Sequence, residues 1–523
     1  MKMLGFKKNK IPYEFEIKKS PSIRVLPGLK DLTSVRYPLI MPFASAHVLW
    51  SEDFKEYVYE VEEPILNKKE KEILEMLRQN LTEKLSINVA LEAKNPIDQL
   101  QKQLKSVILE LRLDKNIDEK GFKKFAYYVY RDFFGLNRIE PLLHDVYVED
   151  IECNGVNEPL YVVHRVYGNL RTNLIYKDSE ELGDFIEKLA QKAGHYVSFA
   201  NPLLDGALPD GSRVNATYSS DVTTSGPTFT IRKFNKDPLT PIDLINNGSG
   251  SAGIFAYLWM VVEHRLNIMI IGETAAGKTT LLNTIANFIP TSARVCSIED
   301  TREINIAHSN WLPSVARAGF GSMGLGEITL FDLLKESFRQ NPDYVIVGEV
   351  RGKEAYVMFQ GMASGHPTMA TFHAENVEAL VKRLENPPIN LPGDFVQVMD
   401  LVVKADHFKS SSDAYRKITM LAEIEKNSKK DVDYNMYFDA EKKQPYSEKS
   451  YVLKRIVKKS GMKEKDIRKE LDKRKRLLQG LVDSGMRGYM RFSGIVSDFY
   501  KNPEKVLSDW GVKDGKTSKS KKA

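Results

Sequence analysis

Cysteine is almost absent from this chain. Of its 523 residues, only Cys153 and Cys296 carry a thiol. Two thiols cannot build a disulfide framework or a four-cysteine zinc site, so both are excluded. Such a low cysteine content is typical of proteins from a reducing compartment, and we therefore expect a cytoplasmic protein.

Long hydrophobic runs are also missing. The longest apolar stretch begins at Ile254 and is interrupted by Glu263, His264 and Arg265, well short of the roughly 18–20 residues that cross a bilayer. Residues 1–10 are basic, but no apolar segment follows them as it would in a secretory signal. We therefore expect a soluble chain without a membrane-spanning helix.

The net charge of the chain is small, and the first thirty residues carry an excess of bases as large as that of the whole chain. The 76 lysines and arginines exceed the 70 acidic residues by six, and residues 1–30 alone hold eight bases against two acids. Because the remainder is close to neutral, no nucleic-acid partner is expected. We interpret residues 1–31 as a loosely held basic arm, either solvated or in contact with a partner or acidic lipid, and residues 513–523 as a disordered basic tail.

The length and the sequence patterns divide the rest into two domains. Residues 32–236 mix short strands with amphipathic helices, and Gly168-Asn169 between two alternating runs predicts a β-hairpin. Residues 237–253 hold two prolines and the run Asn-Asn-Gly-Ser-Gly-Ser, which predicts a linker. Residues 254–512 alternate buried strands with helices and end in a helical C-terminal extension. The predicted fold class is thus α/β, a mostly parallel sheet covered by helices on both faces, preceded by a mixed α+β domain.

A glycine-rich loop follows the short apolar strand at residues 267–271. It fits G-x-x-x-x-G-K-[ST] and leads into a helical segment. Its glycines let backbone N–H groups face phosphate oxygens, and the helix N-terminus adds partial positive charge. Lys278 would reach the β- and γ-phosphates of ATP, and the Thr279 hydroxyl would hold Mg²⁺. The predicted nucleotide-binding residues are Gly272, Glu273, Thr274, Ala275, Ala276, Gly277, Lys278, Thr279 and Thr280.

A second apolar strand ends in an acid. The run Tyr-Val-Ile-Val-Gly precedes Glu349, about seventy residues after the loop. Proteins with such a loop need an acid beside the metal that orients or deprotonates the attacking water. We predict this role for Glu349, together with a contact to Mg²⁺, direct or through water.

Two further blocks flank this second strand. Residues 297–303, Ser-Ile-Glu-Asp-Thr-Arg-Glu, come before it, and residues 361–374, with His366 and His373, come after it. A phosphate loop, an aspartate box, a strand ending in Gly-Glu and a histidine box, in this order, closely resemble the type II/type IV secretion system ATPase superfamily.

Within the first domain, residues 210–220 and 229–234 are similar to the archaeal branch of this superfamily. That branch includes the motor and assembly ATPase of the archaellum, the closest resemblance, and those of archaeal type IV pili. The resemblance covers roughly residues 39–408. It implies a RecA-like P-loop ATPase domain, ATP and Mg²⁺ as cofactors, and a homohexamer with ATP bound between the two domains of each subunit.

The resemblance also implies roles for residues around the phosphates. Arg213 and Arg232 match basic residues of the first domain that close onto the phosphates, where a guanidinium can make two parallel hydrogen bonds. Glu299 and Glu349 are both candidates for the general base. Asp300 would orient the loop or the metal shell.

The histidine box and one helix carry the remaining candidates. The resemblance points to His366 as a hydrogen-bond partner of the γ-phosphate, whereas His373 is equally consistent with a structural role. The two histidines lack a third ligand for zinc. Relatives usually carry two arginines four residues apart, thought to act across the subunit interface. In this chain the second of these arginines is retained as Arg339, and the first is replaced by Lys335. A lysine keeps the positive charge but cannot make the two parallel hydrogen bonds of a guanidinium group. Arg317 is a lesser candidate.

The implied function is a cytoplasmic ATPase, peripheral at the inner face of the cell membrane. It would couple ATP hydrolysis to assembly or rotation of an archaeal filament through a polytopic membrane platform protein and cytoplasmic accessory proteins. The four motifs belong to the ATP-hydrolysing core and do not identify the machine that the ATPase drives. An adhesive-pilus, DNA-uptake or conjugation ATPase is therefore an open alternative. A DNA-translocating or recombination ATPase has little support from the near-neutral body. A non-hydrolysing scaffold is disfavoured because Lys278, Thr279 and Glu349 are all present.

Overall fold

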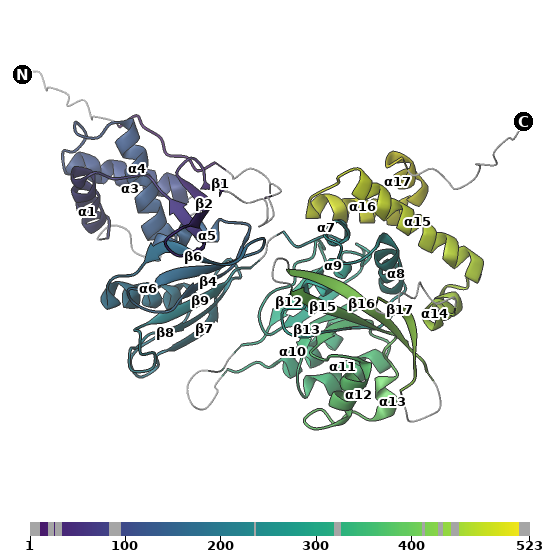
Figure 1. The fold of residues 1–523 in the computed structure, drawn as a ribbon. Coiled ribbons are helices and arrows are strands. Elements are labelled where there is room, and N and C mark those ends of the chain that lie inside the picture. The colour runs from purple at the N-terminus through teal and green to yellow at the C-terminus, as the bar shows by residue number, and fades with distance from the viewer. Residues whose placement is uncertain are drawn as a thin grey trace, which may run out of the picture. The chain divides into compact units, whose positions relative to one another are not determined.

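The chain forms two compact units, Met1–Phe234 and Asn235–Ala523 (Figure 1). The computed structural model describes residues 11–18, 26, 34–82, 96–234, 237–317, 319, 326–409, 414–426, 432–440 and 449–511. Residues 1–10 of the predicted arm and the predicted tail at residues 513–523 lie outside the described residues.

The described part of the predicted arm, residues 11–18, packs onto the first unit. Phe15 is buried, and its main-chain N–H and C=O both pair with the side-chain amide of Gln101 at 2.9 Å. Lys18 adds an isolated antiparallel bridge to Met41. This stretch therefore differs from the loosely held arm that was predicted, because its alternating apolar residues have a core to enter.

The first unit is built on a nine-stranded sheet in the order β1-β2-β3-β6-β5-β4-β9-β8-β7. Neighbouring strands pair antiparallel except β3 and β6, which are parallel. The predicted hairpin is present as β5 and β6, but its turn is formed by residues 165–167, and Gly168 and Asn169 are the first residues of β6. The strands are β1 (Ser34–Ile40), β2 (Ala44–Ser51), β3 (Glu56–Glu62), β4 (Val148–Cys153), β5 (Pro159–His164), β6 (Gly168–Ile175), β7 (Leu203–Ala207), β8 (Arg213–Thr217) and β9 (Thr228–Arg232).

Helices of the first unit bury one apolar stripe each against this sheet and one another. Leu74, Leu77 and Leu81 recur at helical spacing and are buried. Asp118 caps the helix that follows it by accepting from the N–H of Gly121. The helical segments are α1 (Lys68–Thr82), α3 (Pro96–Glu110), α4 (Glu119–Val129), the π-helical turn η2 (Tyr130–Phe134), η3 (Asn137–Ile139), α5 (Glu140–Leu143) and α6 (Ser179–Lys192).

The second unit contains an eight-stranded sheet in the order β12-β11-β13-β14-β10-β15-β16-β17. The first six strands in this order are parallel, and β16 and β17 continue antiparallel. The strands are β10 (Ile268–Ile271), β11 (Val295–Glu299), β12 (Trp311–Val315), β13 (Tyr344–Val350), β14 (Thr368–Phe372), β15 (Leu401–Lys409), β16 (Ala414–Ile424) and β17 (Tyr434–Asp439).

Both faces of this sheet are covered, as β10 shows. Ile268 and Ile270 enter one hydrophobic cluster, and the alternate Met269 and Ile271 enter another. Figure 1 shows α8 and α9 on one side and α11, α12 and α13 on the other. The predicted fold class, a RecA-like α/β domain preceded by an α+β domain, is confirmed. These helices are α8 (Ala252–Glu263), α9 (Lys278–Ala286), α10 (Leu330–Ser337), the 3₁₀ turn η4 (Phe338–Gln340), α11 (Glu354–Ala363), α12 (Val377–Glu385) and α13 (Gly393–Val396).

Residues 237–253, predicted as a linker, are largely part of the second unit. They contain helix α7 (Pro241–Asn246), which Thr240 opens with a reciprocal capping box to Asp243. Ile242 and Leu244 of this helix are buried in the core. The prolines and asparagines that predicted a linker are thus residues at the start and the end of a helix. The boundary between the two units lies earlier, between Phe234 and Asn235.

Four helices follow the sheet, and α15 packs against α8. They are α14 (Tyr451–Ser460), α15 (Glu464–Asp483), α16 (Tyr489–Lys501) and α17 (Pro503–Asp509). On α15, Arg474 lies over the rings of Trp259 and Phe499 and pairs with Glu263 at 2.6 Å. In the described part of the chain, no helix combines the length and apolarity needed to cross a bilayer.

Candidate functional site

The glycine-rich loop joins the carboxyl end of β10 to α9. Gly277 caps α9 in the left-handed conformation, with φ 86°, and Ala275 also has a positive φ of 62°. Gly272 has φ 152°, and a Cβ there would lie 2.2 Å from the carbonyl oxygen of Ala405. The turn therefore requires glycine, and it places the first N–H groups of α9, which have no intrahelical partner, around the loop.

Substitution of Gly272 by alanine tests this packing. We expect a loss of about 1–3 kcal/mol in the free energy of unfolding, because both the backbone conformation and the Ala405 carbonyl must adjust. Gly494→Ala is the matched control, since nothing lies within 4 Å of a Cβ at this position in α16, and alanine there should stabilise the helix by about 0.5–1 kcal/mol. Urea unfolding measures both; equal effects would contradict the packing.

Lys278, the first residue of α9, reaches back across the loop. Its Nζ donates to the carbonyl oxygen of Glu273 at 2.9 Å. Burial lowers the pKa of this ammonium, and the carboxylates of Glu349 and Glu303 oppose that shift. A half-buried cation beside unpaired helix N–H groups is suited to a chain of phosphates. The residues present therefore fit the nucleotide that the loop pattern predicts.

Acidic residues lie at the same edge of the sheet as this loop. Because the strands are parallel, their carboxyl ends meet at one edge. Glu299 is the last residue of β11, and Glu349 is the last but one of β13. The loop follows β10, whose Ile271 is in register with Phe372 of β14. The strand topology thus brings together three blocks that are far apart in the sequence.

Glu299 is buried and holds the turn that follows β11. It is 1% exposed, and its Oε1 accepts the N–H groups of Glu303 and Ile304, each at 2.8 Å. Its Oε2 is buried without a hydrogen-bond partner among the described residues. Burial raises the pKa of this carboxyl to about 7. The two backbone N–H groups favour the charged form and lower the pKa, but their effect is smaller than that of burial. Glu299 can therefore change protonation near neutral pH.

The raised pKa of Glu299 predicts a pH-dependent stability. Because the folded pKa lies above the ordinary value of 4.5, the folded state holds this proton more tightly, and stability is lost as pH rises towards 7. Between pH 5 and 8 the wild type should lose about 2–3 kcal/mol more than Glu299→Gln. Urea unfolding at both pH values checks this; parallel losses in the two proteins would contradict it.

Glu349 and Asp300 share one arginine. Nε of Arg351 donates to Oε2 of Glu349 at 2.9 Å, and Nη1 of Arg351 lies 3.6 Å from Oδ2 of Asp300. Glu303, which the sequence analysis did not single out, is exposed and close enough to Lys278 to act on its pKa. The carboxylates that act on Lys278 are thus those of Glu349 and Glu303, and the buried Glu299 accepts the main-chain N–H of Glu303.

The donor set also fits Mg²⁺. Thr279 lies in the first turn of α9, and Asp300 and Glu349 lie at the same edge. In the described part of the chain, no group of three or more His, Cys, Asp or Glu forms a metal cage. Mg²⁺ at phosphate sites is usually held by one or two carboxylates, waters and the phosphates themselves, so these residues suffice.

Comparison with known proteins shows the family of this chain. The profile of the type II/IV secretion system protein family matches residues 145–404. The uncharacterized protein MJ0900 of Methanocaldococcus jannaschii is 39% identical over 390 residues, which is 72% of this chain and 70% of that protein. The chain belongs to the type II/IV secretion system protein family.

More distant members include VirB11. Protein VirB11 of Agrobacterium fabrum is 26% identical over 46% of this chain and 76% of its own length. The crystal structure of the VirB11 ATPase from the Brucella suis type IV secretion system, in complex with sulphate, covers 54% of this chain and 92% of its own, at 23% identity and a TM-score of 0.28.

For this secretion-family chain, the structure corrects the placement of His366. His366 precedes β14, so it lies at the amino end of that strand, whereas the glycine-rich loop lies at the carboxyl end of parallel β10. A five-residue strand spans roughly 17 Å. His366 instead contacts Ser364 Oγ at 3.2 Å and the ring of Phe338. The exposed His373 directly follows β14 and therefore lies at the edge of the loop.

Arg213 and Arg232 are brought together within the first unit. They are cross-strand partners on β8 and β9. Arg213 makes a bidentate pair with Asp205, at 2.9 and 3.1 Å, and Nε of Arg232 lies 3.2 Å from Asp150. Two neighbouring guanidinium groups on one sheet surface can bind one anion, and their role at the phosphates stays a prediction.

The candidates on and near α10 are exposed. Arg339 lies in η4 and forms a long ion pair of 3.7 Å with Glu336, its side chain 76% exposed. Lys335 lies over the ring of Phe331, and Nε of Arg317 donates to the carbonyl of Gly326 at 2.9 Å. A role across a subunit interface stays a prediction for Arg339, Lys335 and Arg317.

Sequence reasoning missed Arg416, which contacts the glycine-rich loop. Its Nε donates to the carbonyl oxygen of Ala275 at 2.9 Å, and its Cδ lies 3.1 Å from where a Cβ on Gly277 would be. Arg416 reaches the loop because β15 runs past the end of β10 and β16 returns beside it. No local pattern marks this residue; only the register of the hairpin does.

Proposed function

We propose that this chain is a Mg²⁺-dependent ATPase. The observation that carries this proposal is the meeting of Lys278, the first turn of α9 and the acidic residues Glu349 and Glu303 at one edge of a parallel sheet. Lys278 and the N–H groups can bind the phosphates, and the two carboxylates can bind the attacking water molecule. Phosphoryl transfer requires both kinds of contact.

Each residue has a defined task in this proposal. The loop N–H groups and Lys278 bind the β- and γ-phosphates, and Glu349 or Glu303 orients the attacking water and accepts its proton. Glu299 holds the turn that carries Glu303 and is a positioning residue. A bound Mg²⁺ would neutralise charge on the phosphate oxygens, with Thr279 and Asp300 near it.

The further proposal concerns what the ATPase drives. We infer that a homohexamer couples hydrolysis to assembly or rotation of an archaeal type IV pilus-like filament, the archaellum, through a membrane platform protein. Supporting it are the archaeal relative over 72% of the chain and the solvent-exposed guanidinium groups of Arg213, Arg232 and Arg339, each of which is paired with a carboxylate of its own unit. An adhesive-pilus, DNA-uptake or conjugation ATPase of this family is the alternative.

Dependence on protein concentration tests the ring. If part of each site comes from another chain, ATP turnover per chain should rise with concentration and level off where the hexamer is complete. Phosphate release and sedimentation velocity over the same dilution series measure both quantities. Turnover per chain that stays constant while the oligomer dissociates would contradict the shared site and leave the single-chain ATPase intact.

A further inference from the structure

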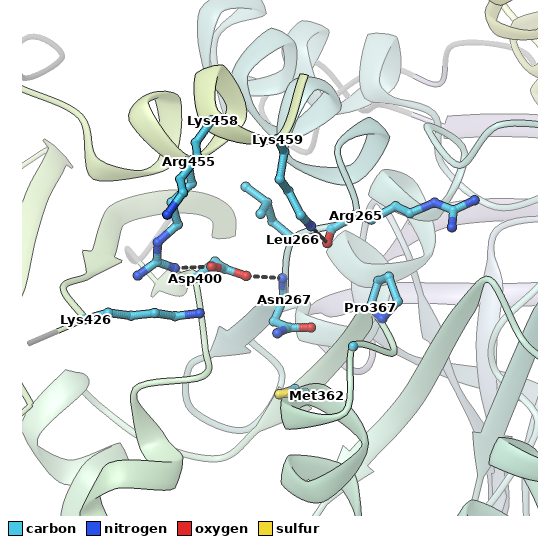
Figure 2. Close-up of a pocket in the computed structure, with 11 residues that line it drawn as sticks. Arg265, Leu266, Asn267, Met362, Pro367, Asp400, Lys426, Arg455, Lys458 and Lys459 are labelled. Carbon is cyan, nitrogen blue, oxygen red and sulfur yellow. Dashed lines mark hydrogen bonds and ion pairs between the residues drawn. The ribbon is translucent and has the colours of Figure 1, made fainter. Parts of the chain in front are cut away.

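A second pocket lies at the opposite edge of the parallel sheet. Its volume is about 390 Å³ (Figure 2). Asn267, Pro367 and Asp400 line it, and each directly precedes one of the parallel strands β10, β14 and β15. The other wall is helix α14, which belongs to the C-terminal helices. The pocket is therefore separate from the glycine-rich loop, which lies at the carboxyl ends of the strands.

Positive charge in this pocket exceeds negative charge. The cationic lining residues are Arg265, Lys426, Arg455, Lys458 and Lys459, and the acidic one is Asp400. One oxygen of Asp400 pairs with Arg455, and the other accepts the main-chain N–H of Asn267 at 2.7 Å. Both oxygens are thus engaged, and one carboxylate can offset only about one of the cations.

The remaining cations differ in what they contact. Arg265 is paired with Asp343 at 2.9 Å. Nζ of Lys459 donates to the carbonyl oxygens of His264 and Arg265, at 3.2 and 3.0 Å. Figure 2 shows the Lys426 side chain extending towards Asn267 across the pocket. Burial lowers the pKa of Lys426 and of Lys459, the Asp400 carboxylate opposes this shift, and neighbouring cations such as Arg455 add to it.

The lining also has an apolar side. Leu266, Met362 and Pro367 face the same hollow as the cations. Its volume lies within the range of pockets that hold small organic ligands. A group with several oxygens and more than one negative charge can accept charge-assisted hydrogen bonds from several ammonium groups at once.

We propose that this pocket binds a multivalent phosphate group, carried by a small soluble molecule or by a lipid headgroup. Lys426, Lys458 and Lys459 donate to the phosphate oxygens, and the apolar side contacts the rest of the ligand. Because α14 forms one wall and the strand ends form the other, the bound ligand joins the C-terminal helices to the sheet.

Pyrophosphate binding to the full chain tests the proposal. Equilibrium dialysis should find two sites in the wild type, the glycine-rich loop and this pocket. The double variant Lys426→Gln/Lys458→Gln should lose the pocket site, with affinity falling at least about tenfold. Lys278→Ala should weaken the loop site alone, so a failure of the ATPase proposal is seen separately. Lys454→Gln, on α14 over the ring of Tyr451 and outside the pocket lining, is the matched control.

Vesicles distinguish the two sources of the phosphate. If a lipid headgroup is the ligand, wild type and Lys454→Gln should sediment with phosphatidylglycerol vesicles and not with phosphatidylcholine vesicles, and the double variant should fail to do so. A single pyrophosphate site in the wild type together with equal vesicle binding of all variants would overturn the proposal. So would dissociation of the oligomer in the double variant without a change in phosphate or vesicle binding, because the pocket would then hold another copy of the chain.

Discussion

Replacing Lys278 with alanine should lower kcat for ATP hydrolysis at least about 100-fold, a loss of roughly 2.7 kcal/mol in transition-state stabilisation. Lys278 is the cation whose ammonium crosses the glycine-rich loop, and no other lysine lies within residues 272–280. Charge that develops on the transferred phosphoryl group would then lose the ammonium group that the loop supplies. Phosphate release under saturating ATP and Mg²⁺ measures the effect.

Two controls keep this result specific. Lys454→Ala removes an exposed lysine of the same unit whose ammonium lies over the ring of Tyr451, and its turnover should match the wild type. Thermal unfolding of Lys278→Ala should also match, because the side chain makes one hydrogen bond, to a carbonyl. Turnover of Lys278→Ala within about twofold of the wild type would refute the assignment of the loop as the catalytic phosphate site.

Replacing Glu349 with glutamine should lower turnover by about 100- to 1000-fold while ATP binding is retained. Glutamine preserves the shape and can still accept a hydrogen bond from Arg351, but it cannot take a proton from water. The carboxylate also places negative charge near Lys278, and its removal should strengthen rather than weaken phosphate binding because less negative charge then repels the phosphates. Fluorescent-nucleotide titration and phosphate release separate the two effects.

Glu303→Gln and Glu385→Gln complete this comparison. Glu385 ends α12 and is exposed away from the loop edge, so its variant should behave as the wild type. If Glu303→Gln loses turnover and Glu349→Gln keeps it, the proton is accepted by Glu303 and the assignment of Glu349 is wrong. Equal activity of all three variants would argue against hydrolysis assisted by a carboxylate.

Much of the site follows from local sequence patterns. The glycines of the loop are required by backbone conformations that the structure shows at Gly272 and Gly277. The acids Glu299 and Glu349 are recognisable in the sequence as the ends of apolar strands, and because those strands are parallel, their carboxyl ends meet at one edge. The loop glycines are recognised from a few neighbouring residues, and the acidic edge follows from the rule that parallel strands end at the same edge of a sheet. A single sequence is sufficient for each of these two inferences.

Other features depend on tertiary structure. His366 and His373 lie at opposite ends of β14. The structure therefore places His373, and not the predicted His366, at the edge of the sheet that carries the glycine-rich loop. The pKa of Glu299 depends on its burial, and Arg416 reaches the loop only through the register of a hairpin. The helix at residues 241–246 resembles a linker in sequence because its capping residues are also those of turns.

A structure of the protein with Mg²⁺ and a non-hydrolysable ATP analogue tests the central claim most directly. We predict that the β- and γ-phosphates lie against the N–H groups of residues 274–279, with Lys278 Nζ moved from the Glu273 carbonyl to phosphate oxygens. Density for the analogue elsewhere, with Lys278 still bonded to Glu273, would contradict the account.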